Sequence, residues 1–214
     1  TVWVYTPAVT SPTKVQESCQ RQKMALVGLH IVHKTASAPQ WIWSTFEHVD
    51  NAPQLDDVSA KRLRARYNFF DAACTSASCA TTINAKPPRP WNPNVQPFPN
   101  HFRSQIARVL GVTKEVTDMN AGFQGLLGKS VWSHYMLLST QWPTDPTSTR
   151  DPNGAPAPSY LANTTMETYI QGKTPESSSS CIKCHGVAVD TAAHKSDFTY
   201  ILERAHSKNA GAGK

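Results

Sequence analysis

The sequence lacks any apolar run long enough to cross a membrane, although 39% of its 214 residues are hydrophobic. A spanning helix needs about 20 consecutive apolar residues, so we predict no membrane span in this chain. It also lacks a dense Lys/Arg tract with interleaved aromatic residues, which leaves nucleic-acid binding without support. No nucleophile triad, phosphate loop or pair of catalytic carboxylates is recognisable, so hydrolytic catalysis is not indicated.

Charged residues are few, at 17%, and the formal net charge is +6. A mildly basic surface of this kind can steer an acidic partner, or it can be a solvated surface without a special role. The 16 prolines argue against an all-helical bundle. No signal peptide is visible before Thr1, and the first residues already have the pattern of a strand. We therefore expect that residues upstream were removed, or that the chain is a fragment.

The most informative motif is Cys181-Ile182-Lys183-Cys184-His185. This C-x-x-C-H spacing is typical of covalent c-type haem attachment. The two thiols form thioether bonds to the ring, and the following histidine becomes the proximal iron ligand. A redox dithiol or half of a zinc site is the alternative, but neither a βαβ context nor a second ligand pair is evident. We therefore predict one haem c, with Cys181, Cys184 and His185 as its attachment and proximal ligand residues.

Three further cysteines are present. Cys74 and Cys79 flank a small polar loop and could form a local disulfide in an oxidising compartment. Cys19 is then left over, as a buried thiol, as the partner of a cysteine outside this chain, or in exchange with one of the other two. Haem attachment to this motif is expected outside the bacterial cytoplasm, so the predicted location is the periplasm or the extracellular space.

The position of the motif restricts the fold. Only 29 residues follow His185 and none is methionine, which excludes the arrangement of the familiar small cytochromes c. Proteins of the cytochrome c′ class carry the motif near the C-terminus of a four-helix bundle. The strand patterns and the prolines of this sequence do not fit such a bundle. The predicted fold class is α+β, with an antiparallel β body, long Pro-rich loops and a short helical C-terminal segment that carries the haem. Residues 1–160 would form the body, and residues 161–214 would form the helical segment packed on it.

Local patterns predict the individual elements. Residues 24–34 and 41–49 are expected to pair as an antiparallel hairpin with both faces covered. The remaining predicted elements are strands at 1–10 and 131–142, a helix at 113–128, a polyproline-like stretch around 87–99, and C-terminal helices at 163–170 and 198–206.

The sixth iron ligand would decide the chemistry. His30 and His33 are the first candidates, because both lie in an apolar strand where an unpaired imidazole is costly. Alternation places them on opposite faces of that strand. Met166 and Tyr169 are candidate haem-contacting residues on the predicted helix before the motif, and Met166 is the second candidate ligand. For each, ordinary core packing is the alternative. Glu47 is a candidate partner for an imidazole.

Several segments together resemble one family. They are LVGLHIVHKT (26–35), PQWIWSTFEHVDNAP (39–53), STQWP (139–143), LANTTMETYIQ (161–171), SSCIKCH (179–185) and DFTYILERA (197–205). The chain resembles, from about residue 24 to residue 206, uncharacterised proteobacterial monohaem "cytochrome c family" proteins. The resemblance implies haem and export, and it implies a longer protein of which this chain is a C-terminal portion. It implies no particular activity.

The sequence thus predicts an exported monohaem c-type cytochrome that exchanges single electrons with a protein redox partner, for which an acidic surface would be complementary. One alternative is a haem enzyme or a protein that binds a small ligand (peroxide, NO or CO) at an open distal site. Another is a haem-bearing subunit of a larger redox assembly, in contact with further copies or subunits.

Overall fold

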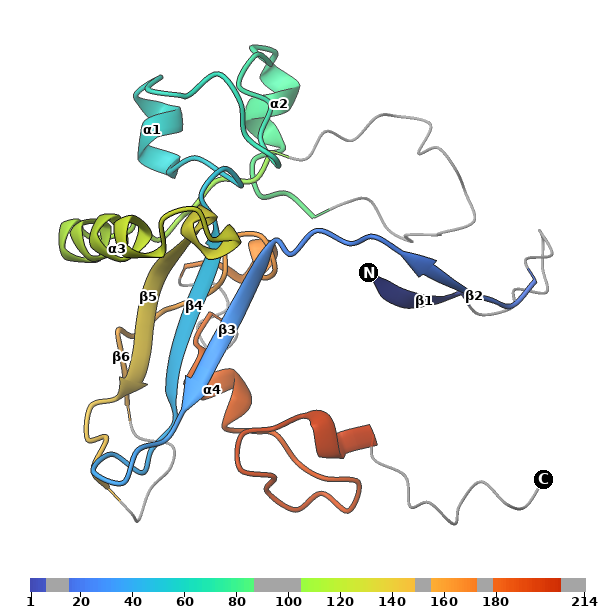
Figure 1. Cartoon of the computed structure of the whole chain (residues 1–214), viewed down its shortest axis with the longest axis vertical. Helices are drawn as coiled ribbons and strands as arrows, with labels where there is room; N and C mark the ends of the chain where they lie inside the picture. The colour runs from blue at the N-terminus through green and yellow to red at the C-terminus, as the bar shows by residue number, and fades with distance from the viewer. Residues whose placement is uncertain (7–15, 87–104, 149–154, 173–178, 205–214) are drawn as a thin grey trace.

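A computed structural model describes residues 1–6, 16–86, 105–148, 155–172 and 179–204. In these ranges the chain forms two antiparallel sheets and a few helices, most of them short (Figure 1). The strands are β1 (Val2–Thr6), β2 (Ser18–Gln22), β3 (Gly28–His33), β4 (Ile42–His48), β5 (Tyr135–Pro143) and β6 (Pro156–Ala157). The helices are α1 (Leu55–Ser59), α2 (Ala77–Thr81), α3 (Lys114–Leu127) and α4 (Cys181–His185), with 3-10 turns η1 (Val131–His134), η2 (Thr168–Ile170) and η3 (Ile201–Arg204).

The main sheet has the strand order β3-β4-β5-β6, with every neighbour antiparallel. The predicted hairpin is confirmed, because β3 pairs with β4 from Gly28 opposite Glu47 to His33 opposite Ile42. Along β4 buried and half-buried residues alternate strictly. Since side chains alternate between the faces of a sheet, one face carries Trp43, Thr45 and Glu47, and the other carries Phe46.

The two faces of this sheet meet different parts of the chain. The Trp43 face, which also carries His30 opposite Thr45, is covered by residues 161–163 and by α4. The Phe46 face, which carries Leu29 and Leu137, lies toward α3. A register shift between Thr45 and Phe46 in the β4–β5 ladder marks a bulge at the middle of the sheet.

The N-terminal strands β1 and β2 pair only with each other and lie apart from the main sheet (Figure 1). Most of their described side chains are exposed, including Trp3 at 69% and Tyr5 at 59%. The free thiol of Cys19, on β2, is exposed, so it is not a buried thiol. Cys74 and Cys79 form the predicted local disulfide.

The long helix α3 follows its sequence signals closely. The Thr113 side chain accepts a hydrogen bond from the Val116 N–H at the N-terminus, and Glu115 lies in the first turn. Gly128 ends the helix with φ 54°, a conformation that favours glycine. No helix among the described residues is long and apolar enough to span a membrane, in agreement with the prediction.

The predicted fold class is wrong. The described residues form two separate antiparallel sheets, and the one long helix, α3, lies in the middle of the chain and not at its C-terminal end. No helical C-terminal haem segment is present: in place of helices at 163–170 and 198–206 the described residues contain the 3-10 turns η2 and η3 and the single helical turn α4. The disulfide pair lies apart from the motif, in the segment around α2.

Other predictions were also corrected or lie outside the described ranges. The faces of the edge strand β3 are not both covered, since Ile31 is 52% exposed and Val32 is 40% exposed. The polyproline-like stretch at 87–99 lies outside the described residues.

Candidate cofactor-attachment site

The helix α4 consists of the motif itself, Cys181–His185. It begins at Ser180, whose hydroxyl accepts a hydrogen bond from the Lys183 N–H at 3.4 Å. A helix of five residues has almost no stability by itself, so other parts of the chain must hold it. The cysteines are three residues apart, which places both thiols on one side of the turn.

The side chain of Gln141 attaches α4 to the sheet. Its Oε1 accepts hydrogen bonds from the Ile182 N–H at 3.0 Å and from the Ser180 hydroxyl at 3.2 Å. Its Nε2 donates to the Pro158 carbonyl at 2.7 Å. Gln141 is fully buried, at 0% exposure, so each of these bonds would be costly to lose. The strand β5 therefore fixes the position of the motif through one amide.

An apolar cluster surrounds the motif. It contains Trp43, Leu161, Cys181, Ile182 and Phe198, with Trp41 packed against it. Residues 161 and 179 add a backbone hydrogen bond, from the Leu161 N–H to the Ser179 carbonyl at 2.8 Å. Burial, followed by the negative charge of Glu167, raises the pKa of the Cys181 thiol to about 12. A thiol held in this protonated form is a poor nucleophile, which counts against a redox dithiol.

The imidazole of His185 is oriented by a backbone carbonyl. Its Nδ1 lies 2.8 Å from the carbonyl oxygen of Phe198, and a carbonyl can only accept, so Nδ1 carries the proton. The lone pair is then on Nε2, the nitrogen available to a metal. The ring also packs between Trp43, at 4.3 Å between centroids, and Tyr200, at 5.4 Å. These contacts fix the plane of the His185 ring and leave Nε2 as its unprotonated nitrogen.

His30 and His33 occupy different positions. His30, Glu167 and Trp43 line a small cavity together with the motif residues Cys181, Cys184 and His185. The His30 Nε2 lies 3.4 Å from a carboxylate oxygen of Glu167, and both side chains are about 30% exposed (31% and 30%). His33 lies opposite Ile42 on the other face of the sheet. The structure therefore brings His30, and not His33, to the motif.

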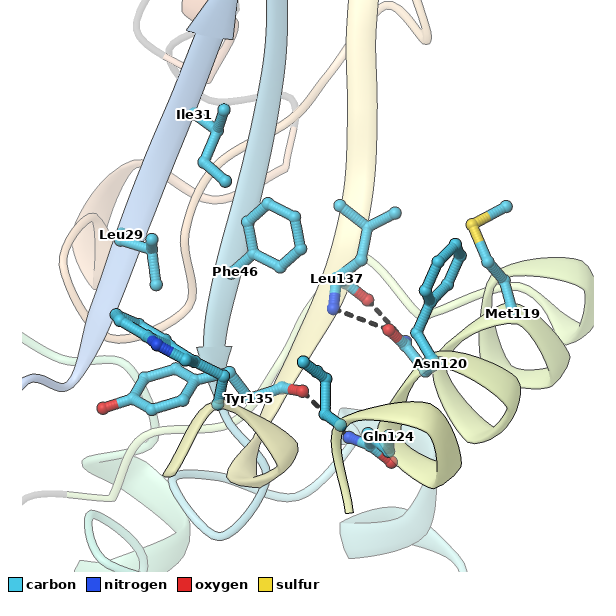
Figure 2. A pocket seen from close by; sticks show the side chains of 11 residues that line it. Leu29, Ile31, Phe46, Met119, Asn120, Gln124, Tyr135 and Leu137 are labelled. Atoms are coloured by element: carbon cyan, nitrogen blue, oxygen red, sulfur yellow. Dashed lines mark hydrogen bonds between the residues drawn. The ribbon is translucent and has the colours of Figure 1, made fainter. Parts of the chain in front are cut away.

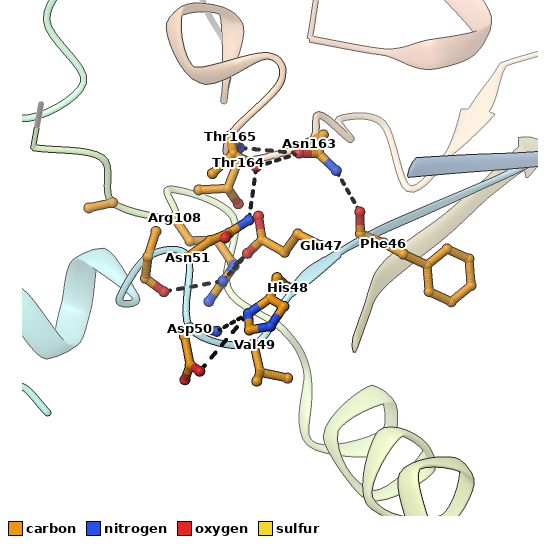
Figure 3. Close-up of polar contacts among 12 residues, drawn as sticks. Phe46, Glu47, His48, Val49, Asp50, Asn51, Arg108, Asn163, Thr164 and Thr165 are labelled. Atoms are coloured by element: carbon orange, nitrogen blue, oxygen red, sulfur yellow. Dashed lines mark hydrogen bonds and ion pairs between the residues drawn. The ribbon is translucent and has the colours of Figure 1, made fainter. Parts of the chain in front are cut away.

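The other predicted residues are not brought to the cavity. Met166 and Tyr169 are 42% and 43% exposed, and neither lines the cavity, which Ile170 of the same turn does. Glu47 does not bond an imidazole. It is buried at 0% exposure and forms an ion pair with Arg108, itself 4% exposed (Figure 3). The sequence did not indicate Glu167 as the carboxylate beside His30, because no local pattern shows that residues 161–170 pack next to β3.

Asn163 holds this segment against the sheet. Its Nδ2 donates to the Thr45 hydroxyl at 2.9 Å and to the Phe46 carbonyl at 2.9 Å (Figure 3), where the β4–β5 ladder shifts register. Its Oδ1 accepts from the N–H groups of Thr165 and Met166, both at 3.1 Å. Gly28 leaves the space for this amide: a Cβ there would lie 2.9 Å from the Asn163 Nδ2.

The donor set fits a haem better than the alternatives. Two thiols on one turn and an imidazole with a free Nε2 are the residues that a c-type haem requires. The indole Nε1 of Trp43 is buried without a hydrogen-bond partner among the described residues, and a carboxylate of a bound group could accept from it. The cavity measures about 40 Å³, far less than a haem, so a haem here would extend past the partly exposed rim. Among the described residues no three His, Cys, Asp or Glu side chains are grouped as a metal site.

Comparison with known proteins adds no relative. No protein-family profile, no curated protein and no solved structure matches the chain. The resemblance to monohaem proteins therefore stays a prediction.

Proposed function

We propose that this chain is an exported c-type cytochrome, with one haem attached at Cys181 and Cys184, that transfers single electrons to or from a protein partner. The observation that carries the proposal is the pairing of a C-x-x-C-H turn with the 2.8 Å contact between the His185 Nδ1 and the Phe198 carbonyl. That contact is the one expected of an imidazole that ligates through Nε2. It has no evident purpose in a dithiol site.

The chain's own residues would perform four tasks. The bond from His185 to Phe198 fixes the ring plane, and Trp43 and Phe198 exclude water from that side of the imidazole. Gln141 holds the turn against β5. His30 offers a second imidazole at the rim of the same cavity and is the candidate sixth ligand. A bound haem would supply an iron that accepts and returns one electron.

The partner is proposed to be a protein with an acidic surface. The chain's net charge of +6 favours encounter with such a surface, and this attraction is weakened by salt. Export follows from the proposal, since covalent attachment of this kind is expected outside the bacterial cytoplasm. The Cys74–Cys79 disulfide is compatible with an oxidising compartment.

Covalent attachment is tested by expression with and without a cytochrome c maturation system. We expect the matured protein to gain the mass of one haem, which remains bound in denaturant, and to give the reduced spectrum of a haem with two thioether bonds. The double variant Cys181→Ser/Cys184→Ser should gain none. Cys19→Ser removes the exposed free thiol on β2 and should change nothing. A wild-type chain that acquires no haem when it is expressed with the maturation system would overturn the proposal.

A second candidate is a haem protein with an open sixth site, in which His30 transfers protons and does not bind iron. The contact of 3.4 Å between His30 Nε2 and Glu167 favours it, because a carboxylate already occupies the nitrogen that would face a metal. Carbon monoxide added to the reduced protein separates the two. Binding within the mixing time indicates the open site, and slow or absent binding indicates two protein ligands.

A further inference from the structure

A second cavity lies on the opposite face of the sheet from the motif, between the sheet and α3 (Figure 2). Its volume is about 370 Å³, and its walls include Leu29, Ile31, Phe46, Phe123, Leu127 and Trp132. None of the described residues that line it is charged. A cavity of about 150 Å³ with similar walls stays dry and takes up benzene, so this one has space for a molecule of two or three rings.

The cavity exists because amide side chains hold α3 away from the sheet. Asn120 donates to the Leu137 carbonyl and accepts from the Leu137 N–H, both at 2.8 Å, and Gln124 donates to the Tyr135 carbonyl at 2.9 Å (Figure 2). These bonds fix the helix one side chain away from β5. The apolar residues of α3 therefore reach toward the sheet without closing on it, and no residue of α3 is buried.

Three of the polar side chains in the wall, those of Asn120, Gln124 and Tyr135, already have hydrogen-bond partners. The amides of Asn120 and Gln124 bond to the β5 backbone, and the Tyr135 hydroxyl donates to the Leu26 carbonyl at 2.6 Å. A ligand would find aromatic and aliphatic surface and few free hydrogen-bonding groups. A charged or strongly polar molecule would lose its hydration there without replacement.

We propose that this cavity is a binding site for an uncharged aromatic molecule of two to three rings. The four aromatic side chains in its wall suit flat rings, which they can contact by stacking or edge-to-face. The site is independent of the cysteine motif, which lies across the sheet.

The test uses two probes with the same ring skeleton. N-phenyl-1-naphthylamine is neutral, and 8-anilinonaphthalene-1-sulfonate carries a sulfonate. Both become fluorescent in apolar surroundings. We expect saturable binding of the neutral probe at one site per chain, and at least about tenfold weaker binding of the sulfonate, since the cavity wall cannot solvate its charge. Equal binding of the two probes would overturn the proposal.

Two exposed positions on the same helix provide a matched pair. Phe123, 60% exposed, lines the cavity, whereas Leu126, 84% exposed, does not. Phe123→Glu should weaken binding of the neutral probe at least about tenfold, and Leu126→Glu should leave it within about threefold, because only the first brings a charge to the bound rings. Equal losses in both would show that the probe adheres to the outside of α3 and would overturn the site.

A cavity-filling variant gives a third result that does not depend on adding charge. Ile31→Trp, on the edge strand β3, should reduce binding by occupying the space while retaining an apolar wall. Far-UV circular dichroism checks that each variant is folded. Sedimentation of the wild-type chain checks the competing occupant, since a dimer that the neutral probe dissociates would mean that a second copy covers this face, contrary to the proposal.

Discussion

The His30 imidazole and the Glu167 carboxylate lie 3.4 Å apart at the rim of the cavity that contains the motif. They come from segments 137 residues apart, and β3 and the turn before η2 bring them together. The sheet places His33 on its opposite face. The two histidines of one strand therefore make a natural matched pair for experiments on the proposed haem.

His30→Ala should change the iron coordination of the haem-loaded protein, and His33→Ala should not. If His30 is the sixth ligand, its loss opens the site, so carbon monoxide should bind the reduced variant at least about tenfold faster than it binds the wild-type protein. Stopped-flow absorbance measures both. A wild-type protein that already binds the gas at once, with His30→Ala unchanged, would contradict the ligand role.

Gln141→Leu should destabilise the fold by about 2–3 kcal/mol, because it leaves the buried Ile182 N–H and Ser180 hydroxyl without their acceptor. Urea unfolding measures the loss. Gln20→Leu, the same substitution at an exposed position of β2, should change the unfolding free energy by less than about 0.5 kcal/mol. A small effect at Gln141 would mean that the motif is held by its apolar cluster alone.

Arg108→Leu should lower the unfolding free energy by about 3–5 kcal/mol, because it leaves the buried Glu47 carboxylate without its ion-pair partner. The matched control is Arg62→Leu, whose side chain is 66% exposed and pairs with Asp57 at 3.0 Å. A surface pair of this kind contributes at most about 1 kcal/mol. Comparable losses in the two variants would show that the buried ion pair has no special importance to the fold.

We expect Glu47 to contribute to the pH dependence of the unfolding free energy. Burial raises the pKa of this carboxyl above its ordinary value of 4.5, and the charge of Arg108 acts in the opposite direction. Because the pKa of Glu47 is higher in the folded state than in the unfolded state, the contribution of this group to the unfolding free energy is fully present below the unfolded-state pKa. That contribution is lost as the pH rises through the folded-state pKa. Arg108→Leu should steepen that loss, since it removes the opposing charge.

Unfolding free energies measured between about pH 4 and pH 8 test this dependence. The double variant Glu47→Gln/Arg108→Leu serves as the control, because it has no carboxyl at this position to titrate. It should lose the part of the slope that Arg108→Leu adds. A slope that persists in the double variant would assign the pH dependence to other groups.

Gly28→Ala should destabilise the chain by about 1–3 kcal/mol, since the new methyl group would lie 2.9 Å from both the Asn163 amide and the Phe46 carbonyl. Gly125→Ala in α3 meets nothing within 4 Å and should stabilise by about 0.5–1 kcal/mol. The opposite signs make thermal melting of the two variants informative. A neutral Gly28→Ala would mean that the Asn163 bridge can move aside.

Local signals accounted for part of the fold. Thr113 and Gly128 marked the ends of α3, and alternation separated the faces of β3 and β4. A helix was expected at 163–170, and at its start the Asn163 Oδ1 does accept from the Thr165 and Met166 N–H groups. Its Nδ2, however, is bonded to β4. The segment therefore follows the sheet after one turn, which local propensity cannot anticipate.

Of the candidate site, the sequence predicted the local motif and His30, which lines the same cavity. Cys181, Cys184 and His185 are recognisable from their spacing. Glu167, Gln141 and Phe198 contribute through tertiary contacts, which no local sequence pattern predicts. The expectation that both faces of β3 are covered was wrong, and the strand also lies at the edge of the sheet. Strand order is a property of the whole chain, and hydrophobic pattern alone does not determine it.

The shortness of α4 has a consequence for the order of events during folding. One helical turn cannot persist by itself, and its clamp, Gln141, belongs to a strand that must first join the sheet. Before that step the thiol of Cys181 is open to reagents, and afterwards it is buried. Attachment of the proposed haem at this cysteine would therefore have to precede the closing of the sheet over it.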